Sequence, residues 1–254
     1  MVHERADGYF APATPRVLAH RGFALSAPEN TLLAFEHALG LGVDHIETDV
    51  HASRDGIAII AHDPGLDRVA HRRGRIAQHT AAELARVDLG AGQGFASLPD
   101  ALAAFPTARF NIDLKSADAV GPTIDAIRQL RAEHRVLLTS FSERRRSAAL
   151  RLLPEVATSV SGPRFARALL AARAGAMPAV RAALRGVHAV QIPERALGIE
   201  TTAPPLLRAF HAAGVEVHVW TVNAPATMRR LLDRGVDGLI TDRADLALEI
   251  VNGR

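Results

Sequence analysis

"HIETDV", residues 45 to 50, alternates polar and apolar side chains, and "RFNIDLK", residues 109 to 115, repeats that alternation. Side chains two residues apart along a strand point to the same face. Each stretch therefore predicts a strand with one polar face and one apolar face. The apolar faces are expected to pack against helices, which leaves the two polar rows pointing toward the inside of a barrel.

Further runs rich in strand-forming residues predict more strands, at residues 16–20, 135–140, 156–160, 188–192, 215–220 and 237–241. Between the strands, segments rich in Ala, Leu and Arg have helical spacing. In "PENTLLAFEHALGLG", residues 28 to 42, we expect Asn30 to cap the helix and Gly40 or Gly42 to end it. About eight strands alternating with helices predict an α/β protein with the (β/α)8 TIM-barrel fold.

The connection after the second strand is longer than the others. Asp55 and Gly56 predict a tight turn that leads into an extra strand ending at His62. We expect residues 63–97 to form a short insertion over one rim of the barrel, and residues 97–105 to form a covering helix. The chain has 254 residues, the size of a single TIM-barrel domain, so one domain is predicted over residues 1–254.

Composition excludes several classes of site and partner. The chain has no cysteine, which excludes disulfides, thiolate metal sites and a cysteine nucleophile. The net charge is only +3, and the basic run Arg144 to Arg146 is interpreted as a solvated helix start, so no nucleic-acid partner is predicted. No signal-peptide pattern and no apolar run of about 20 residues is present, which predicts a cytoplasmic protein without a transmembrane segment. The sequence leaves the oligomeric state open.

Acidic residues gather at the ends of two predicted strands. Glu47, Asp49 and Asp113 lie late in their strands, and the carboxyl ends of barrel strands form the mouth of the barrel. Three converging carboxylates repel one another unless a cation lies among them. Oxygen ligands favour Mg²⁺ or Ca²⁺ over zinc, with Mn²⁺ as a third candidate. In the alternative interpretation, the acids form structural ion pairs with nearby arginines.

Two histidines are candidates for the same rim. His20 ends the first strand and His62 ends the extra strand, and each precedes a loop. A single histidine in either place is typically packed or on the surface. As a pair beside an acidic cluster, they favour a catalytic site.

Lys115 is the only lysine among 30 Lys and Arg residues. An ammonium group is compact, whereas a guanidinium is a wide planar fork, so a narrow polar site could distinguish them. The alternative is an exposed remnant. Trp220, the only tryptophan, ends its strand and is either an aromatic plug of the barrel or a wall that packs against substrate carbons.

Residues 18 to 63, "LAHRGFALSAPENTLLAFEHALGLGVDHIETDVHASRDGIAIIAHD", closely resemble the N-terminal signature of the glycerophosphodiester phosphodiesterase family. "FNIDLK", "VWTVN" and "GVDGLITDRAD" are similar to the remaining landmarks of that family, so the resemblance covers nearly the full chain. It implies a TIM barrel and an enzyme of lipid and glycerol metabolism, which uses a metal ion to hydrolyse small glycerophosphodiesters to an alcohol and glycerol 3-phosphate.

The resemblance also implies a role for each candidate residue. The acid/base pair would be His20 and His62, the metal ligands Glu47, Asp49 and Asp113, and the phosphate-contacting cations Arg21 and Lys115. Asp113 departs from the family pattern, which usually has Glu at this position. A shorter carboxylate can still bind a hard cation, with a shift of the metal or an additional water.

Two other functions compete with this interpretation. A phospholipase D-like lyase of the sphingomyelinase D type shares the barrel, the two histidines and an Asp-x-Lys pair, and it would form a cyclic phosphate. "PENT", "VWTVN" and the absence of cysteine argue against it. The third alternative is a binding barrel that has lost catalysis.

Overall fold

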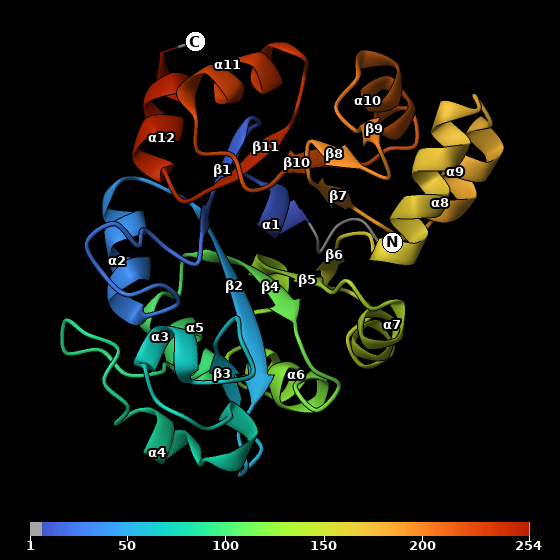
Figure 1. Cartoon of the computed structure of the whole chain (residues 1–254). Coiled ribbons are helices and arrows are strands. Elements are labelled where there is room, and N and C mark those ends of the chain that lie inside the picture. The colour runs from blue at the N-terminus through green and yellow to red at the C-terminus, as the bar shows by residue number, and fades with distance from the viewer. Residues whose placement is uncertain (1–6, 254) are drawn as a thin grey trace.

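Eight parallel strands form a nearly closed barrel in the computed structural model, which describes residues 7–253 (Figure 1). Their order around the barrel is β6, β5, β4, β2, β1, β11, β10, β7. The last gap is narrowed by a parallel bridge between Ser159 and Ala189. The TIM-barrel prediction is thus confirmed. The strands are β1 (Arg16–His20), β2 (His45–Ala52), β4 (Arg109–Leu114), β5 (Val136–Thr139), β6 (Ala157–Thr158), β7 (Ala189–Ile192), β10 (Glu216–Val219) and β11 (Gly238–Thr241).

Helices surround the barrel and bury the apolar faces of the strands. Phe35 of the first of these helices packs edge-on against Phe110 of β4, with ring centroids 5.9 Å apart. Two helices, α8 and α9, lie within residues 162–184, where no helix was predicted. The helices are α2 (Leu32–Gly40), α5 (Leu98–Ala104), α6 (Val120–Gln129), α7 (Glu143–Leu152), α8 (Gly162–Arg173), α9 (Met177–Leu184), α10 (Pro204–His211), α11 (Pro225–Asp233) and α12 (Ala244–Asn252), with a 3-10 turn η2 (Glu133–Arg135) before β5.

The predicted N-cap of α2 is wrong by one residue. Thr31 caps the helix, because its hydroxyl accepts a hydrogen bond from the backbone N–H of Ala34 at 3.2 Å. Asn30 lies just before it with a φ of 57° and turns its side chain toward β2. Its amide donates to Asp49 at 3.1 Å and accepts from Thr48 at 2.8 Å. Asn30 therefore fixes the side chains of Asp49 and Thr48 on β2 and does not cap the helix.

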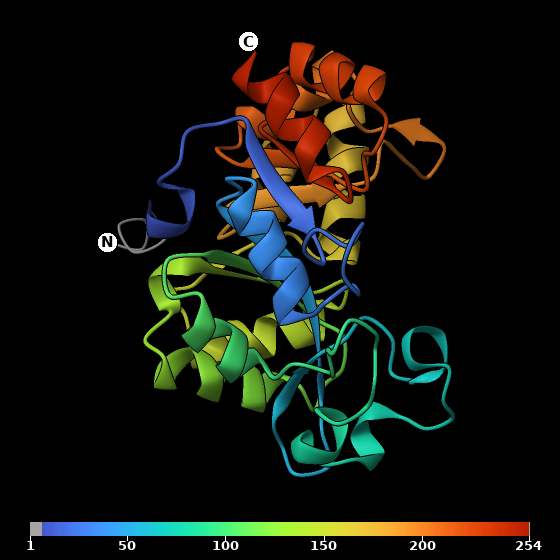
Figure 2. The same ribbon diagram turned by 90° about the vertical axis from the view of Figure 1, so that its left-hand side faces the viewer.

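The long connection between β2 and β4, called the excursion below, begins with the predicted turn and extra strand. Asp55 and Gly56 form the turn, Gly56 with a φ of 77°, and β3 (Ala58–Ile60) pairs antiparallel with β2. Two short helices follow, α3 (Asp67–Ala70) and α4 (Ala81–Leu84), with the 3-10 turn η1 (Ile76–Gln78) between them. They enclose a small hydrophobic cluster of their own around Leu66 and Phe95. Figure 2 shows the excursion on the side toward which β1 points, so it borders the barrel mouth.

The opposite end of the barrel is closed by the N-terminal segment. Tyr9 of α1 (Asp7–Phe10) is buried against Leu137, and its carbonyl lies 2.9 Å from Nε2 of His45. His45 belongs to the inward-facing polar row of β2 and is only 1% exposed. Arg16 forms two hydrogen bonds of 2.8 Å to Glu216 nearby. These contacts leave the other end of the barrel as the open one.

Candidate active site

The strand register brings the predicted acids side by side. Glu47 is paired with Asn111, and Asp49 is paired with Asp113 across β2 and β4. Their side chains point inward, as the alternation predicts, into a cavity of about 260 Å³ at the barrel mouth. Every predicted site residue lines this cavity: His20, Arg21, Glu47, Asp49, His62, Asp113, Lys115 and Trp220.

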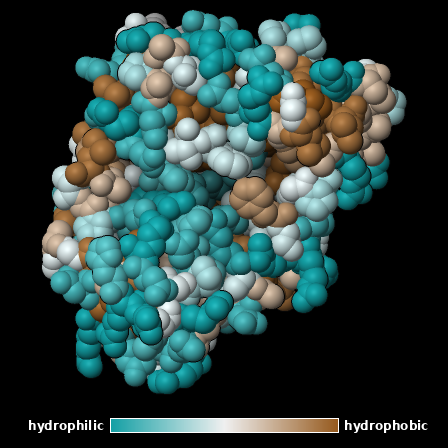
Figure 3. Space-filling view, in the orientation of Figure 1, coloured by the Kyte–Doolittle hydropathy of each residue, from teal (hydrophilic) through white to brown (hydrophobic). Residues whose placement is uncertain are grey.

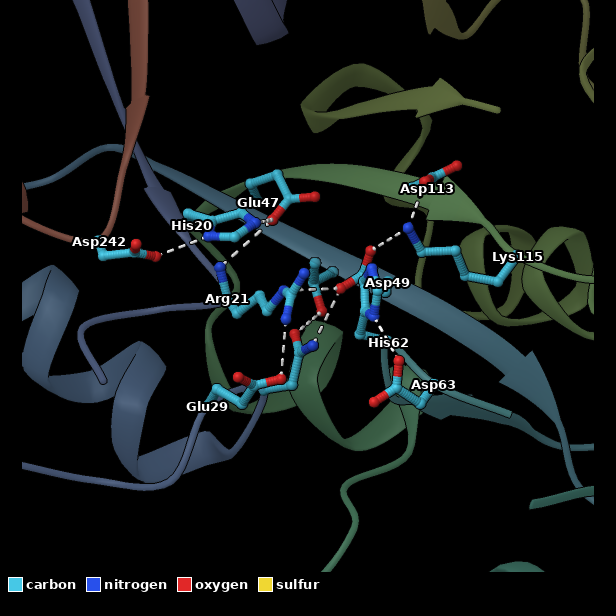
Figure 4. A network of polar contacts seen from close by, with 12 residues as sticks. His20, Arg21, Glu29, Glu47, Asp49, His62, Asp63, Asp113, Lys115 and Asp242 are labelled. Carbon is cyan, nitrogen blue, oxygen red and sulfur yellow. Dashed lines mark hydrogen bonds and ion pairs between the residues drawn. The ribbon is translucent and has the colours of Figure 1, made fainter. Parts of the chain in front are cut away.

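Lys115 lies between two of the acids (Figure 4). Its Nζ is 2.8 Å from Oδ1 of Asp49 and 2.7 Å from Oδ2 of Asp113. Burial opposes the charge on Lys115, but the two carboxylates outweigh it and raise the pKa of its ammonium group. Burial also opposes ionisation of Asp49, where the charge of Lys115 prevails and lowers the pKa of Asp49. For Asp113, burial dominates and raises the pKa. The interior position of Lys115 excludes the exposed-remnant alternative.

Glu47 lacks a close cation. Its Oε2 lies 3.2 Å from the backbone N–H of Arg21 and 3.9 Å from Nε2 of His20. Burial, with the neighbouring charge of Asp49, raises the pKa of Glu47 to about 8. In the described residues, Oδ1 of Asp113 and Oδ1 of Asn111 are buried without a hydrogen-bond partner. Nε of Arg21, a donor, is also buried without a hydrogen-bond partner, so the cavity leaves both acceptor oxygens and a donor unsatisfied.

The donor set fits a hard divalent cation in its chemistry. Such an ion would balance the buried carboxylate of Glu47, which has no close cation. It would also be a partner for Oδ1 of Asp113. However, Lys115 lies between Asp49 and Asp113, and within residues 7–253 no three His, Asp or Glu side chains are grouped closely enough to hold an ion. The geometry combines an ion-pair network with one acid, Glu47, whose nearest cationic side chain is His20 at 3.9 Å.

His20 is held by a carboxylate that the sequence analysis does not assign. Its Nδ1 lies 2.6 Å from Oδ1 of Asp242, whose other oxygen accepts a hydrogen bond of 2.7 Å from Asn223. Burial opposes the charged ring, but Asp242 and Glu47 outweigh it and raise the pKa of His20. Asp242 and Asn223 lie inside the quoted stretches "GVDGLITDRAD" and "VWTVN". Nothing in those stretches indicates that they meet His20, which is 222 residues away from Asp242 in the chain.

His62 has a corresponding partner on the other side of the cavity. Its Nδ1 lies 2.7 Å from Oδ1 of Asp63, and Asp63 also pairs with Arg68 of α3. Arg68 continues to Glu29 at 2.6 Å, and Glu29 accepts from Arg21 at 3.0 Å. The sequence analysis does not identify Arg68. The chain of ion pairs ties the excursion that carries His62 to the loop that carries Arg21.

Arg21 depends on the glycine that follows it. Gly22 has a φ of 83°, and a Cβ at this position would lie 2.7 Å from the carbonyl carbon of Ala34. A larger residue would push the loop away from α2 and move Arg21 with it. As placed, Nε of Arg21 is 3.3 Å from Oδ2 of Asp49, within the acid cluster.

The remaining wall of the cavity is largely apolar. Trp220 packs edge-on against Phe141, with centroids 5.9 Å apart. Other apolar residues that line this side are Val160, Phe165, Pro193 and Ile240. The cavity therefore combines a charged side with an aromatic and aliphatic side.

A model of the Glycerophosphoryl diester phosphodiesterase family matches residues 20–246. The chain belongs to this family. The matched range contains the whole cavity described above, including both histidines, all three acids and Lys115.

Similar proteins agree with this membership. A Mycobacterium tuberculosis protein named probable glycerophosphodiester phosphodiesterase 2 is 44% identical over 93% of this chain and 90% of its own length. A crystal structure of a glycerophosphodiester phosphodiesterase from Agrobacterium tumefaciens is 26% identical, with a TM-score of 0.78 over 94% of this chain and 99% of that one. An Oleispira antarctica phosphodiesterase, solved with the product sn-glycerol-3-phosphate, shares the fold with a TM-score of 0.78 at 23% identity, over 96% of this chain and 99% of that one.

Among the helices of the described residues, none has the length and apolar character needed to cross a membrane.

Proposed function

We propose that this family member hydrolyses glycerophosphodiesters to an alcohol and glycerol 3-phosphate, with a divalent cation and with His20 and His62 as the acid/base pair. Family membership and the 44% identical relative support the activity. The observation that carries the chemistry is the arrangement of two His–Asp pairs, His20–Asp242 and His62–Asp63, on one cavity that also holds Arg21 and Lys115.

The charges of the cavity suit an anionic diester. A phosphodiester carries one negative charge, and attack on phosphorus increases the charge on its nonbridging oxygens. Arg21 and Lys115 line the cavity and would attract those oxygens. Both cations are already held by carboxylates, which limits their motion and favours a fixed position for the phosphate.

Hydrolysis breaks the bond between phosphorus and the oxygen of the leaving alcohol and forms a bond from phosphorus to the attacking oxygen. One histidine removes the proton from the attacking oxygen, and the other gives a proton to the leaving oxygen. The attacking oxygen is that of water, or that of a neighbouring substrate hydroxyl whose cyclic phosphate water then opens to glycerol 3-phosphate. The carboxylates on the Nδ1 atoms of His20 and His62 leave each Nε2 free to face the cavity. Each ring is thereby oriented for proton transfer at one nitrogen.

Glu47, Asp49 and Asp113 would hold the divalent cation. When bound, the ion supplies positive charge beside the phosphate oxygens and replaces the proton that burial otherwise favours on Glu47. Three oxygen donors favour Mg²⁺, Ca²⁺ or Mn²⁺. The unpaired Oδ1 of Asp113 and the lack of a close cation at Glu47 support this proposal. The contact of Lys115 with Asp49 and Asp113 means that an ion would share these two acids with it.

Product analysis tests the proposed reaction. The purified protein is incubated with glycerophosphocholine, glycerophosphoethanolamine or glycerophosphoinositol, with Mg²⁺, Ca²⁺ or Mn²⁺ supplied in turn. Release of free glycerol 3-phosphate is expected. A persistent cyclic phosphate from a lysolipid would instead indicate the lyase, which the family match does not favour.

A further inference from the structure

A second hollow adjoins the mouth cavity at His62. It is a cleft of about 480 Å³ between the excursion and the loop that follows β4. His62 and Lys115 line both spaces. A phosphate held beside these two residues in the mouth cavity would therefore also border the cleft.

Most charged groups that line the cleft already have partners. Lys115 lies between two acids of the mouth cavity, and Asp63 pairs with His62. Nε2 of His51 lies 3.1 Å from the carbonyl oxygen of His62. These contacts fix the side of the cleft that faces the mouth cavity.

Arg75 and Asp118 are the exceptions. Arg75 belongs to the excursion and Asp118 to the loop after β4, and both are exposed residues that line the cleft. In the part of the chain that the structure describes, neither forms an ion pair, whether with the other or with a third residue. The cleft therefore presents one positive and one negative charge that are both available to a ligand.

A third hollow lies beside His20. It has a volume of about 300 Å³, and its charged lining residues besides His20 are Arg21, Glu29 and Asp242. Each of these three is paired, Glu29 with Arg21 and Asp242 with His20. The two free charges thus distinguish the cleft on the His62 side.

The size and surface of the cleft suit the alcohol arm of a diester. Every glycerophosphodiester has the same glycerol phosphate, whereas its alcohol varies in size and charge. The cleft, at about 480 Å³, gives a variable arm more room than the mouth cavity, at about 260 Å³. In Figure 3 hydrophilic side chains cover the excursion with α3 and α4, a surface that matches a polar, hydrated alcohol.

We propose that the cleft binds the alcohol of the diester and favours a zwitterionic amino-acid alcohol, of which serine is the simplest. Arg75 would contact the carboxylate of the serine and Asp118 its ammonium group. This inference rests on the proposed function, and the reaction is the same. The bond between phosphorus and the serine side-chain oxygen breaks, that oxygen takes up a proton, water supplies the oxygen of the new P–O bond, and the products are serine and glycerol 3-phosphate.

Three diesters with the same glycerol phosphate separate the two charges. Their alcohols are serine, which carries both groups, ethanolamine, which lacks the carboxylate, and 3-hydroxypropionate, which lacks the ammonium group. We measure kcat/KM for release of glycerol 3-phosphate with the preferred divalent ion. Because each contact is a partly exposed ion pair, the serine diester should exceed each of the other two by about fivefold. Added salt should reduce this preference.

Variants assign each charge to a residue. Arg75→Gln should lower kcat/KM about fivefold more for the two diesters with a carboxylate than for the ethanolamine diester. Asp118→Asn should lower it about fivefold more for the two diesters with an ammonium group than for the 3-hydroxypropionate diester. Arg72→Gln, in the excursion, and Asp125→Asn, on α6, are the matched controls, because both residues are exposed and lie outside the lining of the cleft. They should leave the order of the three substrates unchanged, and thermal unfolding of each variant shows that the fold is intact.

Two results would overturn the inference while the proposed function stands. One is a kcat/KM for the serine diester that is no higher than for the other two, and the other is an equal loss on all three substrates in either Arg75→Gln or Asp118→Asn. If glycerol 3-phosphate is released from none of the diesters with any divalent ion, the proposed function itself is wrong, and this inference with it.

Discussion

Nδ1 of His20 lies 2.6 Å from Oδ1 of Asp242, and Asn223 fixes the second oxygen of that carboxylate at 2.7 Å. A carboxylate on one ring nitrogen sets the tautomer and the direction of the other nitrogen. In the proposed mechanism Asp242 is therefore a positioning residue, because it would act on the substrate through His20.

Asp242→Asn should lower kcat by about a hundredfold and change KM much less. The imidazole of His20 stays in the cavity, but it loses the carboxylate that sets its tautomer and supports its charge. The pH profile of kcat should also shift. Asp237 forms a similar contact of 2.7 Å with His211 outside the cavity, so Asp237→Asn is the matched control. Equal losses in the two variants would mean that the effect on activity comes from stability alone.

Lys115 should not tolerate arginine. Its Nζ fits between Asp49 and Asp113 at 2.8 and 2.7 Å, a gap that a compact ammonium fills and a planar guanidinium does not. We expect Lys115→Arg to lower kcat/KM at least about tenfold and to weaken binding of the divalent cation. Near wild-type turnover and metal affinity in this variant would make the single lysine an accident of composition.

Divalent cations should stabilise the protein through Glu47. A ligand at about 100 times its Kd adds about 2.7 kcal/mol, which for a chain of this size corresponds to a rise in Tm of about 5 °C. Glu47→Gln should remove the rise, whereas Glu36→Gln, on the exposed face of α2, should keep it. Differential scanning fluorimetry with Mg²⁺, Ca²⁺ and Mn²⁺ measures this, and a rise of the same size in Glu47→Gln would exclude that residue as a ligand.

The closed end of the barrel should become less stable in acid. Burial opposes ionisation of Glu216, but hydrogen bonds from Arg16 and His218 outweigh it and lower the pKa of Glu216 to about 2. A lowered pKa contributes stability that is complete above the ordinary value of 4.5 and is lost as the pH falls toward 2. After allowance for solvent screening, the contribution is roughly 1–2 kcal/mol of the free energy of unfolding.

Urea unfolding at about pH 6 and about pH 3 tests this contribution. Wild type should lose roughly 1 kcal/mol more between the two conditions than Glu216→Gln, which has no carboxylate to protonate, because about half of the contribution is lost by pH 3. If both proteins lose the same free energy of unfolding between the two pH values, the contact of Arg16 with Glu216 does not make stability depend on pH.

The barrel and the acid cluster were predictable because they depend on local rules. Alternation along β2 and β4 fixes which side chains point inward, and the parallel order of the strands brings Asp49 beside Asp113. The carboxylate partner of His20 and the ion pair between Arg68 and Glu29 were harder to identify. Asp242 reaches His20 only because β11 lies next to β1 in the closed barrel, and Arg68 reaches Glu29 only because the excursion folds back over the rim. Neither contact follows from spacing in the sequence.

Asn30 illustrates a different limit. Asn and Thr are both good helix caps, so the adjacent pair Asn30 and Thr31 could not be ranked from propensity. The structure uses Thr31 as the cap and directs Asn30 to Asp49. Tertiary contacts with β2 decide between two residues that local chemistry treats as similar.

We propose that His20, His62 and a divalent ion held by the acid cluster act together on a glycerophosphodiester. The most direct measurement is the rate of glycerol 3-phosphate release by wild type, His20→Ala, His62→Ala and the exposed control His71→Ala, each with the preferred ion and with excess chelator. We predict that the chelator abolishes release, that each cavity variant is at least about a hundredfold slower, and that His71→Ala is unaffected. Release that persists in chelator, or full activity in either cavity variant, would contradict the account.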